Sequence, residues 1–286
     1  MGQIRDRMQQ DLERAGYSLG TVKHYLACAK DFVDHCGGRS PLQLGQDEMR
    51  AFVEHLEGRK LSAQRVRQYL AALKFLYGKT LGRPEETAWV MFPRSRRRTP
   101  AVLSGSEVAR LLAEIESVTC RAVATVCYGA GLRVDEARRL EVTDILSDRG
   151  LLHVRRGKGG HERFAMLSQR LLTTLREYWR AVRPPPPLLF PSALGPRPIH
   201  AETVRTALRK AADAAKIGKR VTPHVLRHSF ATHLLEMGVE MRVIQQLLGH
   251  ASMRSTAVYA QVTSAIVKRT KSPLDVLGTP EAQVLG

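Results

Sequence analysis

A proline-bounded, arginine-dense stretch constrains the fold more than any other feature of this sequence. It reads PRSRRRTP and spans residues 93–100. The stretch has no apolar side chain to bury, and its prolines disfavour a helix that would continue through it. Because the 286 residues of the chain exceed the roughly 100 to 200 residues of one typical domain, we predict two domains, residues 1–92 and 101–286, joined by this linker.

Residues 1–92 have the periodicity of helices throughout. Apolar residues recur three or four positions apart, which places them on one helix face. The segments with this spacing are residues 18–36, 46–58 and 61–82. With a further helix near residues 4–14, the sequence predicts a first domain built from four helices.

Residues 101–286 are also mainly helical, but the period changes once. The segment LLHVRRGKGGHERFAML, residues 151–167, predicts two short strands around the glycine-rich turn GKGG. Helices are predicted on both sides of this hairpin. They begin at Ser104 or Ser106 and recur in residues 120–142 with a break at 129–132, in residues 168–182 and 202–217, and in residues 224–262 with breaks at Gly238 and Gly249. We therefore predict a mainly α fold with a small antiparallel β-sheet in the C-terminal domain.

The charge of the chain indicates a polyanionic partner. Lys and Arg number 45 against 27 Asp and Glu, a formal net charge of +18, which favours nucleic acid, with an anionic membrane as the competing interpretation. No apolar run approaches the ~20 residues that span a bilayer, and the N-terminus MGQIRDRMQQ is polar. We expect a soluble, cytoplasmic protein that binds double-stranded DNA and no membrane.

The positive charge is unevenly distributed along the chain. Residues 1–92 carry 14 basic and 11 acidic residues, whereas residues 101–286 carry 27 basic and 16 acidic ones. The remaining four basic residues are the linker arginines, which we expect along a phosphate backbone, a solvated surface being the alternative. These are Arg94, Arg96, Arg97 and Arg98. In the first domain, the DNA-facing patch is expected on the helix with Arg65, Arg67 and Lys74.

The four cysteines do not have the spacing of a metal site. They contain no CxxC pair and lie in apolar helical patterns, where a free cysteine behaves as a small buried hydrophobe. They are Cys28, Cys36, Cys120 and Cys127. No carboxylate cluster that would hold Mg²⁺ is visible either, so we expect neither a metal nor another cofactor.

One segment predicts a phosphate site at the start of a helix. In TPHVLRHSF, Thr222 is a good N-cap and Pro223 suits the first turn, which places His224 and Arg227 on one face. A helix N-terminus attracts anions, and a guanidinium matches phosphate oxygens. The alternative is a basic, solvent-facing stripe beside an apolar helix face.

Further polar residues lie at positions where chemistry is possible. Arg133 follows a glycine break, with Glu136 three residues later on the same helix face, where it can form a surface pair or orient the arginine towards a ligand. Lys158 lies at the hairpin tip and His250 directly after a helix end. Tyr259 is expected in a short helix whose neighbouring residues are polar. Each of these residues alone is more typical of an ordinary surface or core position, and only their combination favours chemistry.

Taken together, these segments resemble a known family. GLRVDE, GKGGHERF, HVLRHSFATHLLEMG and LLGHASMRSTAVY resemble, in this order, the motif series of the tyrosine recombinases (the phage integrase family), and most closely the Xer type. The first domain is similar to the SAM-like core-binding domain of that family. The resemblance implies a two-domain DNA clamp with the tyrosine-recombinase catalytic fold.

The resemblance also implies an active site. Its members are Arg133, Lys158, His224, Arg227, His250 and Tyr259, with Glu136 in support. A phosphodiester repels nucleophiles, so the two arginines would stabilise the charge of the transition state. Tyrosine is a weak nucleophile at neutral pH and needs a proton acceptor, for which we choose His224, whereas Lys158 would protonate the leaving oxygen and His250 would hydrogen-bond the phosphate.

The function implied is site-specific DNA recombination. Attack by Tyr259 would leave a 3′-phosphotyrosyl bond, and religation would need neither ATP nor metal. A homo- or hetero-tetramer on two sites would exchange strands through a Holliday junction, for integration or excision of a mobile element or for dimer resolution. In that family the tail, here residues 265–278, docks on a neighbouring protomer. The alternatives are a transcriptional regulator with a helix-turn-helix and a type IB topoisomerase-like enzyme.

Overall fold

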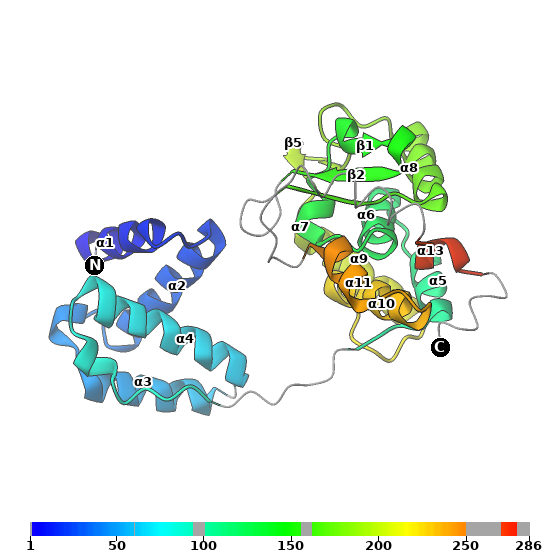
Figure 1. Ribbon diagram of the computed structural model, residues 1–286. Helices are drawn as coiled ribbons and strands as arrows, with labels where there is room; N and C mark the ends of the chain where they lie inside the picture. The colour runs from blue at the N-terminus through cyan, green and yellow to red at the C-terminus, as the bar shows by residue number, and fades with distance from the viewer. Residues whose placement is uncertain (1, 60, 94–100, 156–161, 250–269, 279–286) are drawn as a thin grey trace. The chain divides into compact units, whose positions relative to one another are not determined.

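The chain forms two compact units, Met1–Arg98 and Thr99–Gly286, in a computed structural model (Figure 1). The structure describes residues 2–59, 61–93, 101–155, 162–249 and 270–278. Lys158, His250, Tyr259 and the four linker arginines lie outside the described residues. Each unit has its own buried hydrophobic core.

The four predicted helices of the first unit are present. They are α1 (Gly2–Arg14), α2 (Leu19–His35), α3 (Gln46–Gly58) and α4 (Ala63–Phe75), and α4 continues into a π-helical turn at Leu76–Thr80. Ser18 and Ser62 cap α2 and α4 by accepting hydrogen bonds from backbone N–H groups in the first turn. Phe32 and Phe52 pack edge to face in the core, with ring centroids 5.3 Å apart.

The second unit is built around α6. Its helices are α5 (Gly105–Ala113), α6 (Val118–Gly129), α7 (Val134–Ala137), α8 (Gln169–Val182), α9 (Ala201–Ala214), α10 (Pro223–Glu236), α11 (Met241–Leu248) and α13 (Pro273–Val276). Every residue of α6 from Ala122 to Gly129 is buried, and α6 contacts α8, α9 and α10. The apolar sequence of this helix is thus explained by its place inside the core.

The β-structure is slightly larger than predicted. The predicted hairpin is present as β2 (Leu151–Val154) and β3 (Arg163–Met166), which pair antiparallel. A third strand, β1 (Ile145–Leu146), pairs with β2, and β4 (Pro191–Ser192) and β5 (Gly195–Pro198) form a separate ribbon. These three strands are not predicted from the sequence, because two to four residues are too few to show an alternating pattern.

The end of the tail packs on its own unit in the single chain. Ser272 donates a hydrogen bond from Oγ to the carbonyl of Gly129 at 2.8 Å, and α13 packs against α6, α8 and α10. Leu274 is 3% exposed and lies so close to Gly129 that a Cβ atom there would stand 2.6 Å from its Cδ2. Glycine at position 129 is therefore what allows this contact.

The structure also shows the state of the cysteines, the possible metal-ligand groups and the lengths of the apolar helices. All four cysteines are free, and Cys28, Cys120 and Cys127 are buried, as expected for core residues. Within the described ranges, no group of three or more His, Cys, Asp or Glu side chains could hold a metal ion. The helices of those ranges also include none that is long and apolar enough to cross a membrane.

Candidate active site

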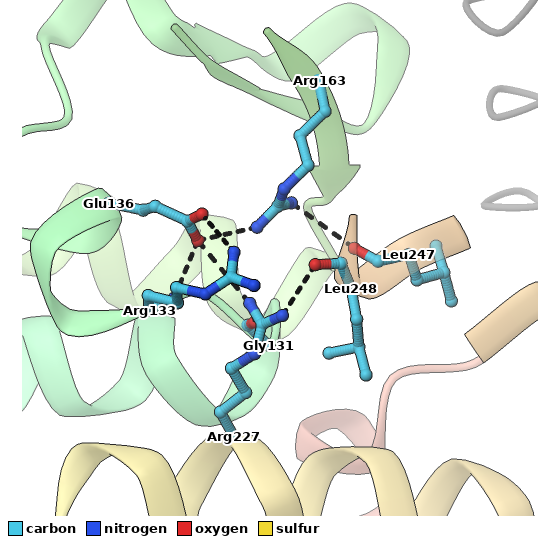
Figure 2. Close-up of polar contacts among 7 residues, drawn as sticks. All are labelled: Gly131, Arg133, Glu136, Arg163, Arg227, Leu247 and Leu248. Carbon is cyan, nitrogen blue, oxygen red and sulfur yellow. Dashed lines mark hydrogen bonds and ion pairs between the residues drawn. The ribbon is translucent and has the colours of Figure 1, made fainter. Parts of the chain in front are cut away.

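A buried carboxylate holds three arginines together in the second unit (Figure 2). Glu136 on α7 is 6% exposed. Its Oε1 accepts a hydrogen bond from Arg133 Nη1 at 2.8 Å, and its Oε2 accepts from Arg163 Nη2 at 2.7 Å. Arg227 Nη1 lies 3.6 Å from the same Oε2. The interpretation that Arg133 and Glu136 form a mere surface pair is therefore wrong.

The turn between α6 and α7 places Arg133 next to this carboxylate. Gly131 has a φ of 62°, and a Cβ atom there would lie 2.6 Å from the ring of Phe230, so only glycine fits this turn. Arg133 then occupies the N-cap position of α7, and its backbone N–H donates to Glu136 Oε2 at 2.8 Å. Glu136 thus fixes both the backbone and the guanidinium of Arg133.

Arg227 links three segments that are distant in the sequence. It lies in the second turn of α10, which begins after the N-cap Thr222 as predicted. Its Nη1 donates to the carbonyl of Gly131 at 2.6 Å and its Nη2 to the carbonyl of Leu248 at 2.7 Å. Both bonds lie in the interior, and Arg227 is 7% exposed. The alternative of a solvent-facing stripe is therefore wrong for Arg227, whereas His224 is exposed.

Arg163 is a member of the cluster that the sequence analysis missed. It begins β3, opposite Val154 on β2, and its side chain is 13% exposed. The strand pattern of the sequence indicates that Arg163 faces inward. Side chains alternate along a strand, so Arg163 lies on the same face as Ala165, which is fully buried. A basic residue on the inner face of a strand calls for a carboxylate partner, here Glu136.

Burial and neighbouring charges shift the pKa values of Glu136 and Arg227. Burial alone would raise the pKa of Glu136, but Arg163 and Arg133 outweigh it, so the net pKa lies below its ordinary value. Burial, together with the nearby Arg133 and Arg163, lowers the pKa of Arg227 to about 10. The lowered pKa leaves Glu136 an anion at neutral pH, and a pKa of about 10 leaves Arg227 a cation. Guanidinium groups stay protonated in proteins in general.

The cluster therefore carries more positive than negative charge, and one arginine faces outward. Side-chain exposure is 27% for Arg133, against 13% for Arg163 and 9% for Arg227. A carboxylate holds these cations in place before any ligand arrives, which is the arrangement that favours an anion such as a phosphate.

Several predicted site residues cannot be placed. Lys158, His250 and Tyr259, with the short helix expected around Tyr259, lie outside the described residues. Residues near Lys158 and His250 in the sequence are described, and these join the cluster. Arg163 lies five residues after Lys158 in the sequence, and Leu248, whose carbonyl bonds Arg227, lies two residues before His250.

Two predicted DNA-binding residues of the first unit contact the segment that leads to the linker. The guanidinium carbon of Arg67 lies 5.2 Å from the ring centre of Phe92, and Lys74 Nζ lies 5.8 Å from it. Arg67 Nη1 also donates to the carbonyl of Pro93 at 3.2 Å. Both cations thus pack on this segment with cation–π geometry.

Arg65 has intramolecular neighbours as well. Its guanidinium carbon lies 5.0 Å from the ring centre of Tyr69, and its Nη1 lies 3.2 Å from Nε2 of His24. The hydroxyl of Tyr69 in turn donates to Asp31 Oδ2 at 2.7 Å. The assignment of Arg65, Arg67 and Lys74 to a DNA face stays a prediction.

Family models match both parts of the chain. The model of the phage integrase family matches residues 101–265. A model described as the N-terminal SAM-like domain of phage integrases matches residues 4–87. The two matches together cover most of the chain.

Related proteins match over nearly their whole length. An integrase/recombinase of Escherichia coli is 34% identical, over 96% of this chain and 94% of the relative. The tyrosine recombinase XerA of Pyrococcus furiosus is 35% identical, over 93% of this chain and 92% of the relative.

Solved structures share the fold. A lambda integrase dimer bound to a core site has a TM-score of 0.70 at 18% identity, covering 88% of this chain and 95% of that one. The XerH recombinase in a post-cleavage complex with its difH substrate has a TM-score of 0.64 at 21% identity, covering 88% of this chain and 77% of that one.

Proposed function

This chain belongs to the phage integrase family of tyrosine recombinases, enzymes that break and rejoin DNA at specific sites, and we propose that Tyr259 is its nucleophile. The observation that carries the proposal is the cluster of arginines around the buried Glu136. Arg133 and Arg227 in that cluster belong to the same ordered series of motifs as Tyr259. Such a cluster provides the charge neutralisation that attack on a phosphodiester requires.

Arg133 and Arg227 would act on the non-bridging oxygens of the scissile phosphate. Negative charge builds on these oxygens as the tyrosine oxygen approaches phosphorus, and a planar guanidinium can donate two hydrogen bonds to them. Arg133 is the most exposed of the three cluster arginines, so its guanidinium offers the outermost contact to the phosphate. Because Glu136 and two backbone carbonyls already hold the guanidiniums, little reorganisation is needed during the reaction.

The other residues of the motif series would transfer protons or hydrogen-bond the phosphate. His224 takes the proton of the Tyr259 hydroxyl as the bond from oxygen to phosphorus forms. The bond from phosphorus to the 5′-oxygen breaks, and Lys158 donates the proton that this oxygen needs. His250 hydrogen-bonds the phosphate. The products are a 3′-phosphotyrosyl bond and a free 5′-hydroxyl.

The second half of the reaction reverses these steps on another strand. A phosphotyrosyl ester conserves the energy of the phosphodiester, so a 5′-hydroxyl can displace the tyrosine without ATP, and the arginines take the electrostatic part that a metal ion plays in other phosphoryl transfers. We propose that a homo- or hetero-tetramer on two sites exchanges strands through a Holliday junction. The biological purpose is integration or excision of a mobile element, or dimer resolution.

The proposed place of action is the cytoplasm, on double-stranded DNA. Four free cysteines suit a compartment in which thiols stay reduced. The net charge of +18 suits a DNA partner, because phosphate contacts with Lys and Arg dominate non-specific affinity for DNA.

Trapping the covalent adduct tests this proposal. Wild-type protein and Tyr259→Phe are incubated with nicked, fragmented genomic DNA of the source organism, denatured with detergent and captured, and the attached DNA is sequenced. We expect wild-type fragments that end at a common cleavage point and no attached DNA with Tyr259→Phe. In a gel-shift assay, both proteins should bind the recovered site with affinities equal within about threefold.

Other outcomes would favour the alternatives. A transcriptional regulator would yield no covalent DNA from either protein, and Tyr259→Phe would change nothing. A type IB topoisomerase-like enzyme would relax supercoiled plasmid that lacks the recovered site and would form no recombinant between two copies of it.

A further inference from the structure

Arg163 contacts two other parts of the site that are distant in the sequence (Figure 2). Its Nη2 donates to Glu136 Oε2 at 2.7 Å, and its Nη1 donates to the carbonyl of Leu247 at 3.4 Å. One side chain thus joins the start of β3 to α7 and to the last turn of α11.

Each of these elements leads directly to a residue of the proposed active site. β3 begins five residues after Lys158, α7 follows Arg133, and α11 ends two residues before His250. We propose that Arg163 is a positioning residue for DNA cleavage, which fixes the hairpin and the end of α11 relative to the Arg133–Glu136 pair. This inference rests on the proposed catalytic roles of Arg133, Lys158 and His250.

The end of α11 is also shaped to receive the Arg163 side chain. Gly249 has a φ of 66°, and a Cβ atom there would lie 2.2 Å from Arg163 Cδ and 2.4 Å from its Nε. Arg163 therefore lies directly against the residue that precedes His250. Glycine at position 249 is needed both for this approach and for the backbone conformation.

Arg163 differs from Arg133, the most exposed of the arginines proposed to bind phosphate. Its side chain is about half as exposed as that of Arg133, 13% against 27%. Its Nε is buried and has no hydrogen-bond partner among the described residues. The other two nitrogens are bonded to Glu136 and Leu247. The side chain thus faces protein, and it acts on the reaction through the residues it holds.

The two contacts also need the shape of arginine. A lysine at this position could pair with Glu136, but its single nitrogen cannot bond the carboxylate and the Leu247 carbonyl at once in the manner of a planar fork. Charge alone is therefore not enough, and Arg163→Lys should fail in catalysis while it retains the ion pair.

Arg138 is a well-matched control. Like Arg163, it bonds one carboxylate and one backbone carbonyl, with Nε 2.7 Å from Asp135 Oδ1 and Nη1 3.4 Å from the oxygen of Ile199. Its side chain is 16% exposed, close to the 13% of Arg163. The hydrogen bonds of its side chain to the described residues go to Asp135 and Ile199, and not to the Glu136 carboxylate or to Leu247.

The experiment compares full-length wild type, Arg163→Ala, Arg163→Lys and Arg138→Ala on a nicked suicide substrate that carries the site recovered with the wild type. We expect all four to bind this DNA within about threefold in gel shifts. Single-turnover cleavage should be about 10- to 100-fold slower for both Arg163 variants, as for other residues that orient catalytic groups. Arg138→Ala should cleave within about threefold of wild type.

A chemically altered substrate separates positioning from phosphate binding. A methylphosphonate at the scissile position removes the negative charge that an arginine would neutralise. We expect it to restore much of the cleavage lost in Arg133→Ala and to leave Arg163→Ala slow. If the methylphosphonate rescues Arg163→Ala equally well, Arg163 is a phosphate ligand and the inference is wrong.

Unfolding midpoints in urea show whether each Arg163 variant folds. If Arg163→Ala does not fold, Arg163→Lys carries the comparison, and failure of both to fold would show a role in stability only. Cleavage by either Arg163 variant within threefold of wild type would also overturn the inference. Wild type and Tyr259→Phe are assayed in parallel. They test the proposed nucleophile separately, because neither protein carries a change at Arg163.

Discussion

Glu136 is the residue on which the geometry of the candidate site depends most. It accepts hydrogen bonds from the backbone and side chain of Arg133 and from the side chain of Arg163, and it lies near Arg227. A buried carboxylate is costly unless it is paired and hydrogen-bonded. Here its partners supply both, so removal of the charge affects three guanidiniums at once.

Replacement of this carboxylate by an amide should destabilise the second unit. Glu136→Gln keeps the shape but leaves partly buried cations without their anion, and we expect a loss of about 3 kcal/mol in the free energy of unfolding. Urea unfolding at pH 7 measures it.

Glu202→Gln serves as the control, because its pair with Arg205 is exposed and should contribute well under about 1 kcal/mol. Equal midpoints for Glu136→Gln and wild type would mean that the arginines do not depend on this carboxylate.

At the scale of the element, α10 connects the site to the start of the second unit. Its first turns carry His224 and Arg227, and its later turns bind Leu103, three residues after the linker. The N–H of Leu103 donates to Ser229 Oγ at 2.9 Å, and His233 Nε2 lies 2.8 Å from the carbonyl of Leu103. Because a carbonyl can only accept, Nε2 carries the proton.

That tautomer leaves the other ring nitrogen of His233 as an acceptor. The hydroxyl of Tyr128 donates to this nitrogen, 2.8 Å from Nδ1. Burial lowers the pKa of His233 below its usual 6.5, against the opposing effects of Glu236 and the hydrogen bond to Leu103. The ring is therefore neutral in the folded protein, and all of its polar atoms are satisfied.

This histidine predicts how stability depends on pH. Between pH 6.5 and the lower pKa of the folded state, the unfolded chain binds a proton that the folded protein does not, so stability falls as pH falls through this window. The slope should be at most about 1.4 kcal/mol per pH unit.

The comparison of wild type with His233→Gln tests it. Urea midpoints at pH 7.5 and 5.5 should differ more for wild type than for His233→Gln, which has no proton to bind at this position. The same difference in both proteins would assign the pH dependence to other groups.

At the scale of the whole molecule, the two units differ in charge. The family comparisons match each unit separately, and the positive excess lies mainly in the second unit and in the linker. In the first unit, Arg67 and Lys74 pack on Phe92 at the approach to that linker. The excess of basic over acidic residues is thus concentrated in the linker and the second unit.

The salt dependence of DNA binding tests the role assigned to the linker. Each phosphate contact contributes roughly 0.9 to the slope of log affinity against log salt concentration. Replacement of all four linker arginines by glutamine, at Arg94, Arg96, Arg97 and Arg98, should reduce that slope by about 3 to 4 if each lies on a phosphate. Fluorescence anisotropy with the recovered site over a range of NaCl concentrations measures it.

A solvated linker would give a different result. The slope would then stay within about 0.5 of the wild-type value. The unfolding midpoint should not change in either case, since the stretch has no apolar side chain to bury.

The sequence by itself determined the features that depend on neighbours within a few residues. Helix starts at Ser18, Ser62, Ser104 and Thr222 follow from side chains that bond backbone groups in the next turn. The helix spacing of apolar residues, the hairpin and the ordered motifs are local patterns as well, and they indicated the fold class and the family.

Only the tertiary structure decided which polar groups meet. Arg227 is buried because carbonyls 96 and 21 residues away accept its hydrogen bonds, and no local pattern reports such partners. The same holds for Arg163, whose carboxylate lies 27 residues earlier in the chain. Periodicity shows that a residue faces inward, but the cost of burying a charge is met by groups that only the folded chain brings together.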